Sequence, residues 1–183
     1  YIQVKGNLII DSIKLTSWDT RKNDYGLTNS SGLLPRSYIL VKAGNGTTNI
    51  TNSEIAYMGY HHPDSFGLTY YSGSGSEIKN NKIHDLYYGF YSSESKVHDI
   101  EILDNEFYHN TIYGIDPHSD SNNLYIKNNK VHNNGKHGII CSTDCYNIVI
   151  DNNTVFNNGQ NGILLHNNVS NSMIKRNHVY NNT

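Results

Sequence analysis

One short stretch of the chain concentrates side chains that can transfer protons. Residues 113–121 read Tyr-Gly-Ile-Asp-Pro-His-Ser-Asp-Ser, which places Tyr113, Asp116, His118 and Asp120 within eight residues. A histidine has an ordinary pKa of about 6.5, so it can accept or release a proton near neutral pH. A tyrosine, with a pKa of about 10, is a competent proton donor. The stretch therefore predicts an active site that works by acid–base chemistry.

The rest of the chain is organised as a repeat that positions this stretch. Isoleucine recurs in steps of 24 residues, and parallel columns of other apolar residues, asparagines and glycines follow at nearly the same step. A fixed period in the low twenties indicates a solenoid, in which each turn packs only on its neighbours. The columns are Ile78, Ile102, Ile126, Ile150, Ile174; Ile83, Phe107, Val131, Val155, Val179; Asn81, Asn105, Asn129, Asn153, Asn177; and Gly89, Gly114, Gly138, Gly162.

The local pattern within each period indicates strands. Short β-branched or alternating runs, such as residues 124–127 and 147–150, are separated by Asn-Asn and Asn-Gly turns. No window carries a helical stripe. We therefore predict an all-β fold, a right-handed parallel β-helix with 24-residue turns of about three strands each. It forms one domain over residues 1–183, with irregular turns at 1–76 and regular turns at 77–183, and we expect it to be a fragment of a longer chain.

Composition narrows the classes of function. The formal net charge is −2 and the pI is about 6.6, which argues against nucleic-acid binding. No apolar run is long enough to span a membrane. Cys141 and Cys145 are expected to be unpaired structural thiols, because four residues of extended chain separate them too far for a disulfide. His61 and His62 lack a third ligand nearby, so we predict no metal site.

The alternation of side chains along a strand assigns faces. Ile115 follows the edge glycine and should point inward, which directs Asp116 and His118 outward, two residues apart. Neighbouring turns lie about 4.8 Å apart, so Tyr113 should lie beside His137 in the next turn, with Lys136 adjacent. The alternative interpretation is an ordinary polar face of a solenoid.

Further residues are predicted to bind substrate. Arg21 and Arg36 fall in a long excursion from the repeat, where loops of a β-helix commonly wall a groove, and they are candidates to contact an anionic ligand. Plain solvated loop charges are the competing interpretation. The predicted binding set is Lys136, His137, Asp120, Arg21 and Arg36, beside the catalytic set His118, Tyr113 and Asp116.

The stretch at 113–118 resembles the Tyr-Gly-Phe/Ile-Asp-Pro-His motif of the mannuronan C-5-epimerases, alginate-modifying enzymes with the β-helix fold. The resemblance extends to residues 87–91 and 136–140, covers roughly residues 50–180, and is strongest to the periplasmic type. It implies an isomerase that converts β-D-mannuronate in polymannuronate to α-L-guluronate. It also implies an anionic polysaccharide as partner, an extracellular or periplasmic location, a monomer, and no cofactor, with calcium left open.

The resemblance gives each residue type a role. H-5 lies beside the substrate carboxylate and is a weak acid until the charge of that carboxylate is offset. His118 is expected to remove H-5, while Tyr113, or a water that it holds, donates a proton to the opposite face. Asp116 either orients His118 and Lys136 or, when protonated, bonds the carboxylate. The periplasmic type carries an arginine where this chain has Thr143, so Lys136 is the candidate positive charge.

Two alternatives remain open at this stage. A uronate lyase of the same fold shares the first proton abstraction and then expels the C-4 oxygen. A non-catalytic carbohydrate-binding β-helix would bind the polymer without exchanging H-5. Many β-helix proteins share the repeat, so the repeat alone does not separate these functions.

Overall fold

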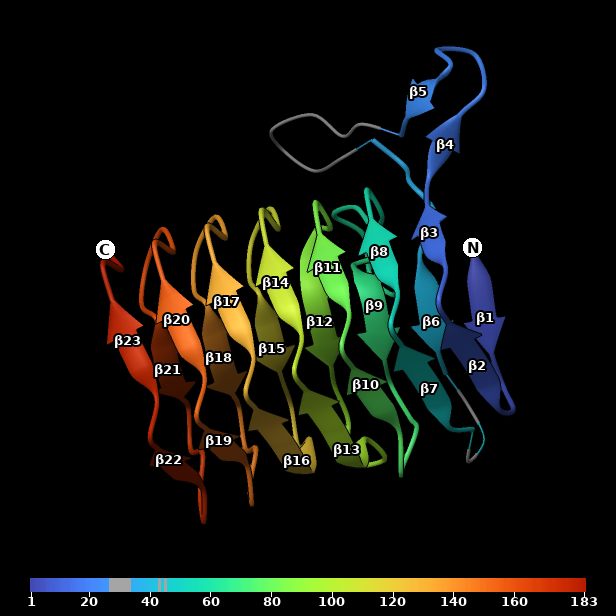
Figure 1. Cartoon of the computed structure of the whole chain (residues 1–183). Coiled ribbons are helices and arrows are strands. Elements are labelled where there is room, and N and C mark those ends of the chain that lie inside the picture. Colours follow the sequence, from blue (N-terminus) through green and yellow to red (C-terminus); the bar gives the residue numbers. More distant parts are fainter. Residues whose placement is uncertain (27–33, 43, 45) are drawn as a thin grey trace.

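The computed structural model describes residues 1–26, 34–42, 44 and 46–183, and these form a stack of β-strand turns (Figure 1). The described strands make three parallel sheets of seven strands each. Sheet A contains β1 (Ile2–Val4), β6 (Ile39–Val41), β9 (Gly67–Tyr70), β12 (Tyr88–Ser92), β15 (Ile115–Pro117), β18 (Ile139–Ser142) and β21 (Ile163–His166). Sheet B contains β2 (Leu8–Asp11), β7 (Thr48–Thr51), β10 (Glu77–Lys79), β13 (His98–Leu103), β16 (Asn122–Lys127), β19 (Val149–Asp151) and β22 (Met173–Lys175). Sheet C contains β3 (Lys14–Thr16), β8 (Glu54–Ala56), β11 (Lys82–His84), β14 (Glu106–Tyr108), β17 (Lys130–His132), β20 (Thr154–Phe156) and β23 (His178–Tyr180).

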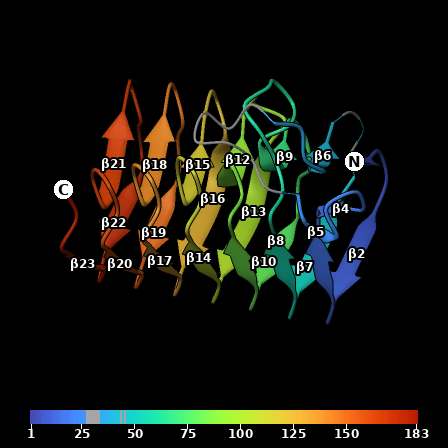
Figure 2. The same cartoon turned by 90° about the horizontal axis from the view of Figure 1, so that it is seen from above.

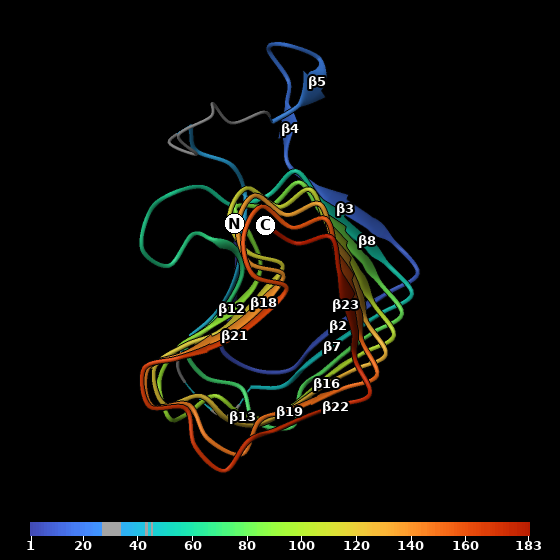
Figure 3. The ribbon, with the colours of Figure 1, turned by 90° about the vertical axis from the view of Figure 1, so that its left-hand side faces the viewer.

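Each turn contributes one strand to each sheet, so the prediction of a parallel β-helix is confirmed. Viewed along the axis, the turns superpose around a narrow interior (Figure 3), and viewed from above the strands follow one another in order (Figure 2). The described residues include no helix, and hence none long and apolar enough to cross a membrane.

The predicted isoleucine column fills the interior. Ile78, Ile102, Ile126 and Ile150 pair in register across sheet B, and all four are fully buried. Ile174 pairs with Ile150 but is 47% exposed, because β22 is the last strand of sheet B in the structure. The 24-residue period therefore equals one step between hydrogen-bonded neighbours.

The predicted asparagine column is a buried ladder of hydrogen bonds. The amide oxygen of Asn129 accepts hydrogen bonds from the backbone N and the Nδ2 of Asn105, at 2.9 and 3.1 Å, and its Nδ2 donates to Ile102 O and to Asn153. A second ladder of the same design, which was not predicted, lies at another corner of the turns. It is formed by Asn110, Asn134, Asn158 and Asn182.

Two connections depart from the regular turns. The antiparallel hairpin of β4 (Trp18–Asp19) and β5 (Asp24–Tyr25) projects from the stack after β3 (Figure 1). The connection from β8 to β9 carries residues 60–64 and is fastened by an ion pair of 2.7 Å between Lys42 Nζ and Asp64 Oδ2. Figure 3 shows it extending outward beside sheet A. Cys141 and Cys145 are both buried free thiols, as predicted.

Candidate functional site

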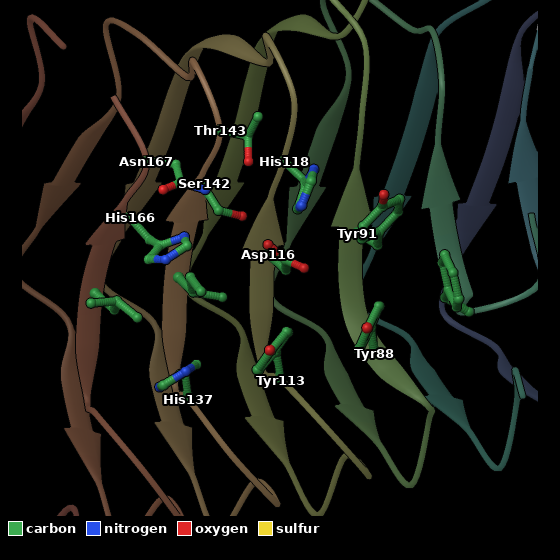
Figure 4. A pocket seen from close by; sticks show the side chains of 13 residues that line it. Tyr88, Tyr91, Tyr113, Asp116, His118, His137, Ser142, Thr143, His166 and Asn167 are labelled. Carbon is green, nitrogen blue, oxygen red and sulfur yellow. The ribbon is translucent and has the colours of Figure 1, made fainter. Parts of the chain in front are cut away.

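A cleft of about 500 Å³ lies on the outer side of sheet A (Figure 4). Its lining comes from four consecutive strands, β12, β15, β18 and β21, and from the residues flanking them. Phe66, at the end of the β8–β9 connection, is also part of the lining. The predicted catalytic residues Tyr113, Asp116 and His118 all line this cleft.

Close packing of the backbone brings Tyr113 to the cleft. Gly114 follows it, and a Cβ atom there would lie 2.5 Å from Val131 Cγ1 and 2.7 Å from Gly138 O, closer than real Cβ atoms approach. Glycine is therefore required where the chain turns into β15. The same arrangement recurs at Gly138, which brings His137 to the corresponding place one turn further.

Tyr113 lies in the middle of an aromatic stack. Its ring centroid is 5.2 Å from that of Tyr88 on one side and 5.2 Å from that of His137 on the other, with interplanar angles of 13° and 21°. The predicted adjacency of Tyr113 and His137 is thus confirmed. Burial, and then the nearby Asp116, raise the pKa of Tyr113, so the phenol keeps its proton at neutral pH.

Asp116 is directed to the outer side of β15, as predicted, but it is only 1% exposed. The outward direction does not expose the carboxyl, because the cleft walls cover it. Its Oδ1 has no hydrogen-bond partner within the described residues. Burial raises the pKa of Asp116 well above its ordinary value, and the neighbouring Ser142 side chain offsets this only in part. The neutral, protonated carboxyl is therefore favoured.

His118 lies just after β15 and is half-buried. Its Nδ1 is 2.6 Å from Ser119 Oγ, and its ring is tilted against that of Tyr91 with centroids 5.9 Å apart. Burial, and then the charge of His166, lower the pKa of His118 below its ordinary value. The neutral imidazole is therefore favoured at neutral pH, which is the form that accepts a proton.

Of the predicted substrate-binding residues, His137 lines the cleft, whereas Lys136 and Asp120 lie outside its lining. His137 lines the cleft, and burial, then Lys136 and His166, lower its pKa; its Nδ1 has no partner among the described residues. Lys136 is exposed and adjoins His137 without lining the cleft. Asp120 is exposed in the turn after β15 and also lies outside the lining.

The two predicted arginines are not part of the cleft. Arg21 is on the β4–β5 turn and pairs with Asp19 at 3.3 Å. Arg36 was predicted to be a loop residue that contacts an anionic ligand, and this was wrong: it is only 7% exposed. Its guanidinium donates to the carbonyl oxygens of Met58, Gly59 and Asp85, which fastens three segments together. Burial lowers its pKa to about 10.

Several lining residues were absent from the predicted site. His166 lies 48 residues after His118, which is two steps of the repeat, and it was not among the predicted site residues. Tyr88 and Tyr91 belong to the turn before the motif, and Phe66 comes from the irregular region. The repeat contained the signal for the first three, whereas Phe66 has no place in it.

The cleft combines proton-transfer groups with aromatic surface. Within the part of the chain that the structure describes, no three His, Cys, Asp or Glu side chains are grouped so as to hold a metal ion. The chemistry that the lining supports is proton transfer between a neutral imidazole, a protonated phenol and a protonated carboxyl.

Comparisons with known proteins agree with this geometry. Residues 37–183 match the family described as "Right handed beta helix region". Mannuronan C5-epimerase from Pseudomonas syringae pv. tomato is 28% identical over 136 residues, covering 68% of this chain and 25% of that protein. Mannuronan C5-epimerase AlgG from Azotobacter vinelandii is 32% identical over 133 residues, covering 65% of this chain and 24% of that protein. The chain thus spans about a quarter of the length of these relatives.

Among solved structures, the chain is similar to those of alginate epimerases. The crystal structure of the periplasmic alginate epimerase AlgG superposes with a TM-score of 0.94 at 28% identity, covering 100% of this chain and 45% of that one. The A-module of mannuronan C-5 epimerase AlgE4 from Azotobacter vinelandii, with a TM-score of 0.64 at 16% identity, covers 96% of this chain and 57% of that one and shares the fold alone. The chain therefore belongs to the right-handed parallel β-helix family, and within that fold it resembles the mannuronan C5-epimerases.

Proposed function

We propose that this chain carries the catalytic cleft of an epimerase that inverts C-5 of β-D-mannuronate residues in polymannuronate. The observation that supports this most directly is the convergence of Tyr113, Asp116 and His118 in one cleft. The shifts in their pKa values favour a protonated phenol, a protonated carboxyl and a neutral imidazole. These are the forms that a proton-abstraction and reprotonation mechanism requires.

Asp116 lowers the barrier to removal of H-5. The pKa of this hydrogen falls as the negative charge on the adjacent carboxylate is offset. A protonated Asp116 can donate a hydrogen bond to a carboxylate oxygen, and its Oδ1 has no partner within the described chain. A charge-assisted hydrogen bond of this kind strengthens as the enolate-like charge develops in the transition state.

His118 removes a proton from C-5, and Tyr113 donates a proton to C-5. In the tautomer whose Nδ1–H donates to Ser119 Oγ, a neutral His118 has a free lone pair on Nε2 and acts as the base. Tyr113, held between Tyr88 and His137, keeps its proton and acts as the acid on the opposite face of C-5. Inversion follows because His118 takes a proton from one face of C-5 while Tyr113 gives a different proton to the other face. Solvent then removes the proton from His118 and returns one to the Tyr113 phenolate, so the proton that arrives at C-5 originates from water.

The same proposal defines the partner and the setting. The substrate is an anionic polysaccharide, and its sugar rings can contact the aromatic wall of Phe66, Tyr88 and Tyr91. We propose that the protein is a monomer. We also propose that it acts in the periplasm or outside the cell, since the similar solved structure of AlgG is named as that of a periplasmic epimerase. Calcium is not needed for the proton-transfer steps described above.

Proton NMR of polymannuronate incubated with the protein in deuterated water tests the proposal. The expected result is deuterium at C-5 and the appearance of guluronate signals with chain length unchanged. Unsaturated chain ends that absorb in the ultraviolet would instead identify a lyase. Polymer binding without any loss of the H-5 signal would identify a non-catalytic binding protein.

A further inference from the structure

The cleft contains no permanent positive charge in the part of the chain that the structure describes, although its proposed substrate is a polyanion. No lysine or arginine is among the lining residues, and the nearest predicted candidate, Lys136, adjoins the cleft without lining it. The carboxyl of Asp116 is neutral and offers one hydrogen bond. Among the described lining residues, only the imidazoles of His118, His137 and His166 can bring a positive charge into the cleft.

Two of these imidazoles are committed to other contacts. His118 has its Nδ1 against Ser119 Oγ, is half-buried, and must be neutral to act as the base. His137 stacks on Tyr113, is partly buried, and lies next to the ammonium of Lys136, which opposes a second positive charge. Protonation of either group therefore works against its surroundings.

His166 is differently placed. It is the last residue of β21, pairs in register with Ser142 of β18, and is exposed, so a positive charge on it stays in contact with water. Figure 4 shows its ring beside Ser142 and on the same side of the sheet as His118 and His137. Its backbone carbonyl accepts a hydrogen bond from Thr143 N at 2.9 Å, but its ring has no hydrogen-bond partner within the described residues, so both ring nitrogens are free to donate when the ring is protonated.

The register fixes how far this charge lies from the reacting centre. His118 bridges to Ser142, and Ser142 pairs with His166, so the two histidines are two strands apart. Two strand spacings correspond to roughly 9.6 Å between backbones. Asp116 lies on the same strand as the base and can bond the carboxylate of the reacting residue, whereas His166 lies two strands further along the cleft. This places His166 towards the carboxylate on a neighbouring sugar of the same polymer.

We propose that protonated His166 is a specificity-determining residue that binds the carboxylate of a uronate neighbouring the one whose C-5 reacts. The inference rests on the proposed function for the identity of the polymer. It makes recognition of the polyanion dependent on pH, because the cation disappears when His166 loses its proton. A binding residue of this kind changes KM and leaves kcat nearly unchanged.

The groups that face His166 are few. From β18 and the turns around it come Ser142, Thr143 and Asp144, whose carboxylate accepts a hydrogen bond from Asn168 Nδ2. His118 and His137 line the same cleft, and Lys136 precedes His137 in the sequence. Sheet A has no described strand beyond β21. His118 and His137 are thus the groups whose own titration must be separated from that of His166.

Substitutions at His166 separate its effect on polymer binding from the effects of His118 and His137. Binding of polymannuronate to the full chain is measured at pH 5.5, 6.5 and 7.5 for the wild type, His166→Gln and His166→Lys. We expect the wild type to bind about tenfold more tightly at pH 5.5 than at 7.5, the scale of one exposed charge-assisted contact. His166→Gln should bind weakly at all three values, and His166→Lys tightly at all three. His178→Gln, an exposed histidine on β23 of sheet C, should match the wild type.

Two outcomes would overturn the inference. One is wild-type pH dependence retained in His166→Gln. The other is the same pH dependence toward a polymer whose carboxyls have been reduced to alcohols, since no anion is then present to bind. Absence of polymer binding by the wild type at every pH would overturn it as well. Because binding needs no turnover, pH-dependent binding that His166→Gln abolishes, in a protein that never exchanges H-5, would refute the epimerase and leave the role of His166 standing.

Discussion

The rings of Tyr113 and His137, which lie 24 residues apart in the sequence, stack with their centroids 5.2 Å apart and their planes 21° apart. Tyr88 stacks on the other face of Tyr113 at the same distance. Figure 4 shows the three rings following one another along the cleft. Two flanking rings limit the rotation of the Tyr113 side chain, so its hydroxyl is held in position before a substrate arrives. Such preorganisation is what a proton donor in catalysis requires.

Loss of either proton-transfer group should reduce the rate without unfolding the protein. Removing a general acid or base typically reduces turnover by about 10²–10⁴-fold. We expect His118→Ala and Tyr113→Phe to show losses of this order in H-5 exchange, because inversion needs both faces of the carbon. Polymer affinity should change much less than rate, since both groups act mainly on the transition state.

The matched control for these variants is His178→Ala, an exposed histidine on sheet C. It should retain the wild-type rate. Near-normal exchange by His118→Ala, or loss of the cooperative thermal transition in both active-site variants, would show that the catalytic assignment is wrong.

The rate should stay high down to a lower pH than it would with a base of ordinary histidine pKa. Burial and the charge of His166 lower the pKa of His118, and the base works only when it is unprotonated. The rate should therefore begin to fall only below about pH 6.5, the ordinary histidine pKa. The measurement is kcat/KM for H-5 exchange between pH 4.5 and 8, because this ratio reports the ionisation of the free protein. An acid limb centred above pH 6.5 would contradict His118 as the base.

Asp116 should make the protein less stable as the pH rises. Its folded-state pKa is raised well above the ordinary value of 3.8, so between these two values the folded state keeps a proton that the unfolded state releases. This difference lowers the free energy of unfolding by up to about 1.4 kcal/mol per pH unit, starting near pH 4 and ending at the folded pKa. In Asp116→Asn this pH dependence should disappear.

Denaturant unfolding at pH 4, 5, 6 and 7 measures this effect. The stability of Asp116→Asn relative to the wild type should increase over the series. A constant difference between the two proteins would mean that Asp116 ionises normally in the folded state.

The asparagine ladder should account for a large share of the stability of the solenoid. In Asn129→Ala the backbone N and the Nδ2 of Asn105 lose their common acceptor in a buried setting. Leaving two buried donors unsatisfied should reduce the free energy of unfolding by about 2–5 kcal/mol. The control is Gln160→Ala, an exposed polar side chain, which should change stability by about 0.5 kcal/mol or less. Equal effects from the two substitutions would exclude a special role for the ladder.

Arg36 should matter for folding and not for substrate. In Arg36→Met the carbonyl oxygens of Met58, Gly59 and Asp85 lose their donor, and we expect a loss of about 2–4 kcal/mol of stability. Arg21→Ala, on the exposed hairpin turn, should leave stability unchanged. Polymer binding measured at a temperature where both variants are folded should equal that of the wild type, and a selective loss of binding in Arg36→Met would restore a substrate role.

The amino-acid sequence by itself determined the parallel stack, the isoleucine core and one asparagine ladder. In a solenoid each turn packs only on the turns before and after it, so residues one period apart in sequence become neighbours in space. The same rule predicted the contact between Tyr113 and His137. The alternation of side chains along a strand placed Asp116 and His118 on the outer side of β15. The missed ladder ending in Asn182 follows the same period and was equally present in the sequence.

Only the tertiary structure decided how deep the cleft is and which charges enter it. Asp116 is buried because flanking turns and the β8–β9 connection that carries Phe66 form walls around it, and this connection lies in the irregular part of the chain. Arg36 lies in that part as well, and its burial depends on carbonyl groups from segments 22 to 49 residues away. Local pattern cannot specify such contacts, because no period links the partners. The depth of the carboxyl, which decides its charge, and the burial of the guanidinium, which decides its partners, are therefore properties of the folded chain.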